Sequence, residues 1–251
     1  MWLLDLGNSR LKAARATATG LGPVLALPWE GPDLELGLRE ALAGDDAPAW
    51  WASVAPEARG ARVAGVLAEG GRTVRRVTTR AEALGLRIAY ADPSRLGVDR
   101  FLALIAARHA GGAHLLASFG SAITLDLLDA SGRHHGGMIG IAPRHAREAL
   151  AQRFPALDRG NAPWAAGFAA DTPQAVAAGV EAQAVGMVAA AWHEARTRLG
   201  ESPVLGLAGG DAARFAPAIE ALVGVAPVLA EHRVLEGLWH LARAEGALSP
   251  R

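Results

Sequence analysis

The strongest constraint on the fold of this chain is an internal repeat. Residues 4–9 read LDLGNS, and residues 117–122, which follow the pair Gly111 and Gly112, read ASFGSA. In each copy an apolar run leads into a glycine turn. Two more apolar runs follow, and after them apolar residues recur at the spacing of a helix. A repeated series of strands followed by helices predicts two similar α/β lobes.

Hydrophobic periodicity predicts the elements of each lobe. In the first we expect strands over residues 2–6, 11–16, 23–27, 50–54, 74–78 and 87–90, and helices over 34–42, 57–68 and 98–110. In the second we expect strands over 114–117, 122–128, 134–141 and 204–208, and helices over 144–153, 172–199 and 231–244. The predicted domains are therefore an N-terminal lobe, 1–112, and a C-terminal lobe, 113–251.

Composition narrows the classes of partner. The 25 Lys and Arg residues balance the 25 Asp and Glu residues, so we expect neither a nucleic-acid partner nor an acidic membrane surface. The absence of cysteine excludes disulfides and thiolate chemistry. The start of the chain meets Asp5 without a basic leader, which argues against a signal peptide. The apolar stretch around 176–192 is interrupted by Glu181 and predicts a buried helix, so we expect a cytoplasmic protein with no membrane span.

The first copy of the repeat carries a candidate phosphate site between Asp5 and Lys12. Glycine and small polar residues after a strand let backbone N–H groups approach a phosphate. Asp5 could hold Mg²⁺ and Lys12, the only lysine in the sequence, could reach phosphate oxygens. An ordinary hairpin with an exposed lysine explains the motif equally well, so the motif alone leaves both interpretations open.

A second candidate lies between Tyr90 and Arg100. Gly97 precedes a predicted helix, and Asp99 and Arg100 occupy its first turn. An acid at a helix start is favoured by the helix dipole, so a simple N-terminal charge with a neighbouring salt bridge is the interpretation that physics alone favours. The functional alternative is an aspartate that accepts a hydroxyl proton beside an arginine that binds an anionic group.

Other known motifs are missing. The sequence contains no Gly-x-x-x-x-Gly-Lys, no Gly-x-Gly-x-x-Gly, no Gly-x-Ser-x-Gly and no His-Glu-x-x-His. These absences argue against a P-loop, a Rossmann dinucleotide site, an α/β-hydrolase elbow and a zincin. We interpret His134 and His135 as surface residues. The late pair Gly209 and Gly210 could border a nucleotide base or be plain turn chemistry.

The order of the motifs is more specific than any one of them. Asp-x-Gly-Asn-Ser-x-x-Lys, Tyr-x-x-Pro-x-x-x-Gly-Val-Asp-Arg, Gly-Ser-Ala-x-Thr-x-Asp, Gly-Gly-x-Ile and a late Gly-Gly follow one another along the chain. This order resembles that of type III pantothenate kinases, which belong to the superfamily of acetate and sugar kinases and actin. The resemblance implies two duplicated ribonuclease H-like, actin-like lobes, each a mixed sheet flanked by helices, with a cleft between them.

The resemblance also implies an activity and its residues. Members of the family use ATP with Mg²⁺ to phosphorylate pantothenate, the first step toward coenzyme A, and are homodimers with the substrate near the interface. Asp99 would be the proton acceptor. ATP would be bound by Asp5, Leu6, Gly7, Asn8, Ser9, Arg10, Leu11, Lys12 and Ser121. Pantothenate would be bound by Tyr90, Gly97, Val98, Asp99, Arg100 and Thr172.

One position departs from the family pattern. The second glycine turn usually follows an aspartate that binds the activating monovalent cation, K⁺ or NH₄⁺, and here Ser118 stands in its place. A neutral hydroxyl is a poorer cation ligand than a carboxylate, so we do not assign a metal site to it. Two alternatives stay open: a protein of this fold without turnover that acts as a regulatory module, and a kinase for another small hydroxyl compound.

Overall fold

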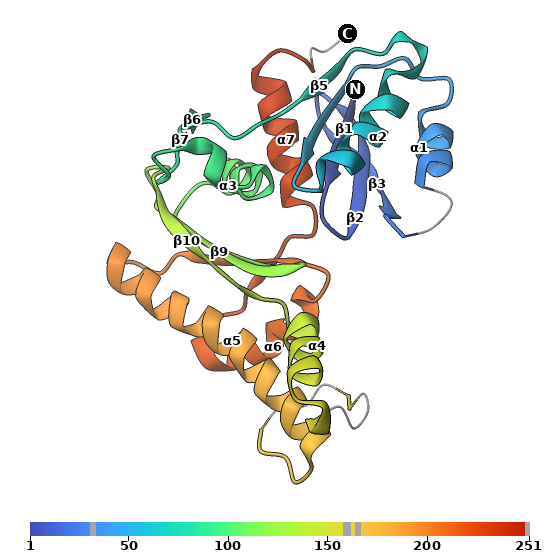
Figure 1. The fold of residues 1–251 in the computed structure, drawn as a ribbon. Helices are drawn as coiled ribbons and strands as arrows, with labels where there is room; N and C mark the ends of the chain where they lie inside the picture. The colour runs from blue at the N-terminus through green and yellow to red at the C-terminus, as the bar shows by residue number, and fades with distance from the viewer. Residues whose placement is uncertain (31–33, 158–161, 164–166, 249–251) are drawn as a thin grey trace. The chain divides into compact units, whose positions relative to one another are not determined.

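The computed structural model describes residues 1–30, 34–157, 162–163 and 167–248, which form two compact units (Figure 1). The first unit comprises Met1–Gly112, Ala130–Gly136 and the residues from His232 onward, and the second comprises Ala113–Asp129 and Gly137–Glu231. The assignment of 1–112 and 113–251 to two lobes stays a prediction.

The first unit is built on a five-stranded mixed sheet in the order β3-β2-β1-β4-β5. β1 pairs with β2 and β2 with β3 in antiparallel fashion, whereas β1–β4 and β4–β5 are parallel. The strands are β1 (Trp2–Leu6), β2 (Arg10–Thr17), β3 (Gly20–Pro28), β4 (Ala49–Ser53) and β5 (Val74–Arg76).

The second unit repeats this arrangement in a five-stranded sheet of order β10-β9-β8-β11-β12. β8 pairs with β9 antiparallel and with β11 parallel, and β11–β12 is parallel. The strands are β8 (His114–Phe119), β9 (Ala122–Leu128), β10 (His134–Ile141), β11 (Val204–Gly209) and β12 (Val228–Leu229). The two sheets share one strand order, so the expected pair of duplicated α/β sheets is confirmed.

Helices cover both faces of the first sheet. α1 (Leu34–Leu42) and α2 (Glu57–Ala68) bury their apolar stripes against Leu4 and Leu6, which alternation places on one face of β1. α3 (Val98–Ala110) and α7 (Arg233–Ala244) pack against each other and against β1 and β4 (Figure 1). The opposite face of β1, which carries Asp5, therefore lies toward these two helices.

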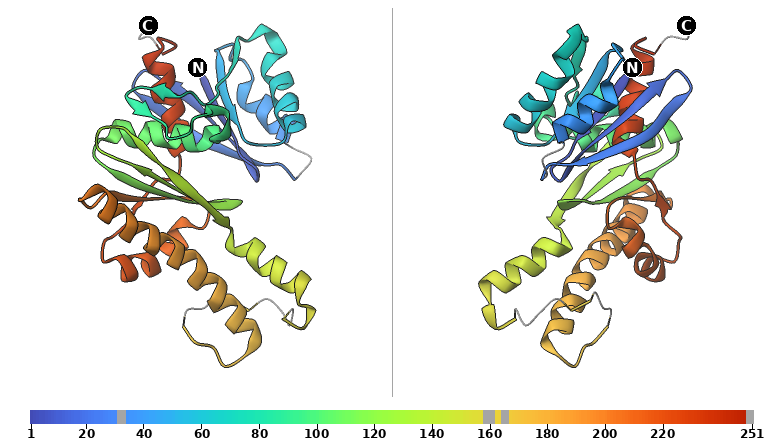
Figure 2. Two further views of the ribbon diagram at one scale, coloured as in Figure 1. Left: turned by 60° about the vertical axis from the view of Figure 1, so that its left-hand side comes forward. Right: turned by 90° about the vertical axis from the view of Figure 1, so that its right-hand side faces the viewer.

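In the second unit α5 (Thr172–Leu199) and α6 (Ala212–Val223) pack on one face of the sheet, and α4 (Pro143–Arg153) packs against α5 (Figure 2). One 18-residue window of α5 has a mean hydropathy of 1.4, enough by length and composition for a membrane span, and half of it is buried inside the protein. A core helix passes the same test, and Val188 and Trp192 of α5 do lie in the core of this unit.

The strand expected over residues 87–90 is wrong in extent. The structure has a two-stranded hairpin, β6 (Glu82–Ala83) and β7 (Leu86–Arg87), closed by Leu84 and Gly85 with φ of 52° and 76°. Beyond Arg87 the backbone N–H of Ile88 donates to the Ala81 carbonyl and that of Ala89 to a histidine side chain. The segment that leads to Tyr90 is therefore held by single contacts and is not part of a strand ladder.

Candidate active site

The predicted phosphate segment is the turn between β1 and β2. The N–H of Gly7 donates to the carbonyl of Arg10 at 3.1 Å and closes the turn, and Asp5 lies directly opposite Lys12 in the ladder. Residues directly opposite in an antiparallel pair share a face, so the carboxylate and the ammonium emerge together. The side chains of Leu6 and Leu11 are fully buried, so only their backbones can line a ligand.

The carbonyl oxygens of this turn are all engaged by the first unit. The indole Nε1 of Trp29 donates to the Gly7 carbonyl at 2.6 Å, and its backbone N–H donates to Ser9 at 3.5 Å. The guanidinium of Arg59 donates to the carbonyl of Asn8 at 2.8 Å. The turn is thus tied to β3 and α2 through its acceptors.

Asp99 lies in the first turn of α3, where Gly97 is the N-cap residue. Its Oδ1 accepts a hydrogen bond from the backbone N–H of Arg100 at 2.8 Å, which fixes the carboxylate over the helix start. A Cβ on Gly97 would lie only 2.6 Å from this oxygen. Glycine therefore leaves room for the carboxylate, and Val98 anchors the same turn by burial.

Asp5 and Asp99 are electrostatically coupled although they are distant in the sequence. The pKa of Asp5 is raised from 3.8 to about 7, chiefly by desolvation and also by the negative charge of Asp99, while the positive charge of Lys12 lowers it. Two carboxylates that destabilise each other's charge favour a cation between or beside them. Among the described residues no group of three or more His, Cys, Asp or Glu could hold a metal. Asp5 could therefore hold Mg²⁺, whose other ligands would come from phosphates and water.

Tyr90 and Arg100 are also brought together. Arg100 is 7% exposed, its Nη1 donates to the Tyr90 hydroxyl at 3.3 Å, and its guanidinium lies 5.8 Å from the ring centroid. The ring of His134 is parallel to Tyr90 with centroids 6.0 Å apart, and its Nδ1 accepts from the N–H of Ala89 at 3.3 Å. The interpretation of His134 as a surface residue is wrong, since it is 1% exposed and packs behind Tyr90.

In the second unit Ser121 follows Gly120 in the turn between β8 and β9. Ser118 holds the place in β8 that Asp5 holds in β1: it is the next-to-last residue of its strand and pairs with Thr124 across an antiparallel ladder. Gly209 has a φ of +96°, and a Cβ there would lie 2.2 Å from the carbonyl oxygen of Phe119. A close approach of the ends of β8 and β11 accounts for this glycine.

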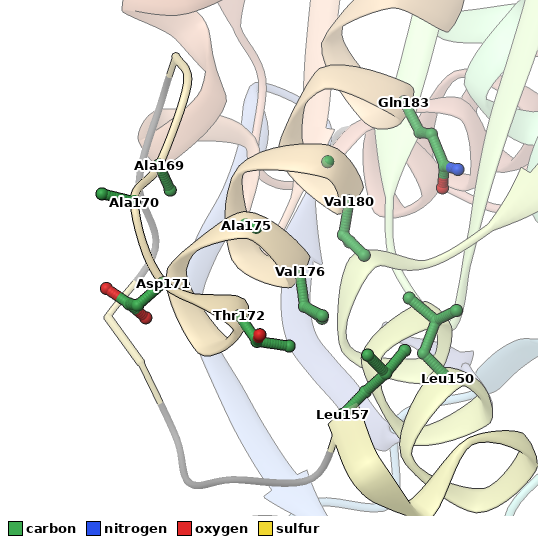
Figure 3. A pocket seen from close by; sticks show the side chains of 11 residues that line it. Leu150, Leu157, Ala169, Ala170, Asp171, Thr172, Ala175, Val176, Val180 and Gln183 are labelled. Atoms are coloured by element: carbon green, nitrogen blue, oxygen red, sulfur yellow. The ribbon is translucent and has the colours of Figure 1, made fainter.

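Thr172 begins α5, where Asp171 caps the helix by accepting from the N–H of Gln174 at 3.1 Å. Thr172 lines a hollow of about 540 Å³ between α4 and α5. Figure 3 shows Leu150 and Val180 on opposite sides of this hollow. Its walls are largely apolar, with the Thr172 hydroxyl and the Gln183 amide among the polar groups.

Comparison with known proteins decides the family. The family model described as type III pantothenate kinase matches residues 1–194. A type III pantothenate kinase of Stenotrophomonas maltophilia is 40% identical over 217 residues, which is 86% of this chain and 88% of that protein. The chain belongs to the type III pantothenate kinase family.

Solved structures agree on the fold. The crystal structure of a conserved putative Baf family transcriptional activator from Campylobacter jejuni has a TM-score of 0.60 at 17% identity and covers 99% of this chain and 100% of that one. The ROK hexokinase of Thermus thermophilus has a TM-score of 0.50 at 16% identity and covers 98% and 100%. At these identities the likeness shows the fold alone, and it confirms the expected actin-like class.

Several residues of this pantothenate kinase family member escaped the sequence argument. Trp29 and Arg59 contact the turn from 22 and 51 positions away. His134 packs against Tyr90 and accepts a hydrogen bond from Ala89, which lies 45 positions earlier in the sequence. No periodicity or motif spacing marks such contacts, because they depend on how strands and helices pack. Composition offers one weak signal: a Trp or His that ends or begins a strand often has a polar group to satisfy.

Proposed function

We propose that this protein transfers the γ-phosphoryl group of ATP to the primary hydroxyl of pantothenate, which yields 4'-phosphopantothenate in the first step of coenzyme A biosynthesis. Membership of the type III pantothenate kinase family supports the reaction. The observation that carries the assignment of roles is the coupling of Asp5 and Asp99 beside Lys12 at a glycine turn. This arrangement combines an aspartate that could hold Mg²⁺, a phosphate-binding turn and a second aspartate that could act as the base.

Phosphoryl transfer requires mainly alignment and charge neutralisation. The backbone N–H groups of Asn8 and Ser9 and the ammonium of Lys12 hold the phosphates. Asp5 would hold Mg²⁺, which would offset negative charge on the phosphate oxygens. Asp99 accepts the proton of the attacking hydroxyl while a new oxygen–phosphorus bond forms at the γ-phosphorus. The bond from that phosphorus to the bridging oxygen breaks, and ADP leaves with the electron pair.

Binding of the acceptor falls to a second group of residues. We assign the pantothenate carboxylate or hydroxyls to Arg100 and Tyr90, because a nearly buried guanidinium held by a phenol presents directed donors. Gly97 and Val98 shape the same helix start. We propose Thr172, which lines the hollow beside α5, as a further pantothenate contact. We propose Ser121, in the glycine turn of the second unit, as an ATP contact.

The remaining assignments complete the proposal. We propose two lobes, 1–112 and 113–251, that arose by duplication, because the strands of the two sheets follow the same order. We propose a cytoplasmic homodimer, and the exposed Ile139 and Ile141 on β10 offer apolar surface for such an interface. Members of the family are expected to need a monovalent cation. Because Ser118 replaces the expected aspartate ligand, we propose to measure whether this protein needs K⁺.

The decisive experiment replaces Asp99 by Asn. Loss of a general base lowers kcat by roughly two to four orders of magnitude, whereas the affinity for MgATP is expected to stay within about threefold. ADP formation from ATP, Mg²⁺ and pantothenate is measured with and without K⁺, and Asp92→Asn serves as the control because that exposed carboxylate caps Ser94.

Near wild-type turnover of the variant would remove Asp99 from the mechanism. A wild-type protein that forms no ADP with pantothenate or with other small hydroxyl compounds would favour the regulatory alternative. ADP formed with a different acceptor in the same panel would keep the kinase and change its substrate.

A further inference from the structure

The peptide planes of the Gly7–Ser9 turn are oriented by two side chains. In a planar trans peptide the carbonyl of one residue and the N–H of the next point in opposite directions, and the described chain contains no cis peptide. Trp29 draws the Gly7 carbonyl inward, so the N–H of Asn8 points the opposite way. Arg59 likewise donates to the Asn8 carbonyl, so the N–H of Ser9 points away from Arg59.

Trp29 and Arg59 form one assembly. The indole is 8% exposed and belongs to the core cluster between the first sheet and its α1 and α2 helices. The Arg59 guanidinium lies 5.1 Å from the Trp29 ring centroid, a distance at which a cation is attracted to the aromatic face. The rigid indole thus holds the guanidinium in place while both donate to neighbouring carbonyls.

An anion site made of backbone needs its N–H groups outward and its carbonyl oxygens turned away, since an oxygen facing a phosphate would repel it. We propose that Trp29 and Arg59 are positioning residues that keep the Gly7–Ser9 turn in this phosphate-accepting orientation. The inference rests on the proposed assignment of the turn to the ATP phosphates. Neither residue need touch ATP, and both act through the peptide planes.

The test measures the Kd of MgATP by calorimetry, which requires no acceptor and no turnover. Trp29→Phe keeps an aromatic ring and removes the donor to Gly7, and Arg59→Gln removes the stacked cation. Each variant is expected to weaken MgATP binding by about tenfold, which corresponds to about 1.4 kcal/mol. In turnover assays the KM for ATP should rise by a similar factor while the KM for pantothenate stays within about twofold.

The same unit supplies matched controls. The guanidinium of Arg76 lies 5.0 Å from the centroid of Trp51, which is also buried in the core, and it donates to Glu57 rather than to the turn. Trp51→Phe and Arg76→Gln should therefore lower stability without changing the Kd of MgATP. Urea denaturation of all four variants shows that each is folded at the assay temperature.

Unchanged MgATP affinity in both Trp29→Phe and Arg59→Gln would overturn the proposal. It would also be overturned if the Trp51 and Arg76 controls weakened MgATP binding as much, because the effect would then follow general destabilisation. Wild-type protein that binds MgATP but does not phosphorylate pantothenate would sink the proposed reaction alone, and the calorimetric comparison would still decide the roles of Trp29 and Arg59.

Discussion

Gly97→Ala separates the geometry of the site from the stability of the fold. The new Cβ would lie 2.6 Å from Oδ1 of Asp99, and a contact of about 3.1 Å requires the oxygen to move by about 0.5 Å. That movement strains the 2.8 Å hydrogen bond from the N–H of Arg100. Since misplacement of a reacting group by about 1 Å costs about 100-fold, a half-ångström displacement should lower kcat by roughly tenfold.

The fold should tolerate the same change. Gly97 has φ −51° and ψ 136°, which alanine adopts without strain, and Val54 at 3.7 Å from the new Cβ is in ordinary contact. We therefore expect the free energy of unfolding to fall by no more than about 1 kcal/mol, the usual difference between glycine and alanine at an N-cap.

The assay combines steady-state kinetics with urea denaturation. kcat is measured at saturating pantothenate and MgATP, and Gly65→Ala is the control because a Cβ there meets nothing within 4 Å. Wild-type kcat in Gly97→Ala, together with a collapse of kcat in Asp99→Asn, would refute the idea that the glycine sets the position of the carboxylate. A large loss of stability in Gly97→Ala would refute the packing argument.

Three further predictions concern the first unit. Gly237→Ala would bring a Cβ to 1.9 Å from a backbone carbonyl oxygen of α3, so urea denaturation should show a loss of about 2–4 kcal/mol, whereas Gly65→Ala on α2 should gain up to about 1 kcal/mol. The raised pKa of Asp5, about 7 against 3.8, means that the folded state binds the proton more tightly, so this group's stabilising contribution is present below pH 4 and is lost as pH rises to about 7. The full effect is at most about 4 kcal/mol, because the side chain of Asp5 is only partly buried. Asp5→Asn should remove this decline from the pH profile of unfolding, and an unchanged profile would contradict the assignment. His134→Phe keeps a ring beside Tyr90 and loses the acceptor for a backbone N–H, so the KM for pantothenate should rise about fivefold with the KM for ATP unchanged, while His134→Asn, which retains an acceptor, should restore it.

Much of the architecture could be predicted from local sequence. The strand Trp2–Leu6 and the helices Leu34–Leu42, Glu57–Ala68 and Val98–Ala110 have the predicted bounds. The periodicity of apolar side chains along a strand or helix is a local property, so it can be recognised without knowing which elements pack together. It failed over residues 87–90, where a short apolar run is held by a turn and by single contacts outside any ladder.

Spacing along the chain was enough to predict most of the helices and strands, their repetition, and the residue types at the glycine turns and at the start of α3. Only the folded structure shows that the carboxylates of Asp5 and Asp99 interact electrostatically and that His134 is buried. It alone also shows that Trp29 and Arg59 donate to the carbonyls of the Gly7–Ser9 turn. The physical reason is that desolvation, charge coupling and peptide orientation depend on distances through space, and packing sets these distances between segments that sequence spacing leaves unrelated.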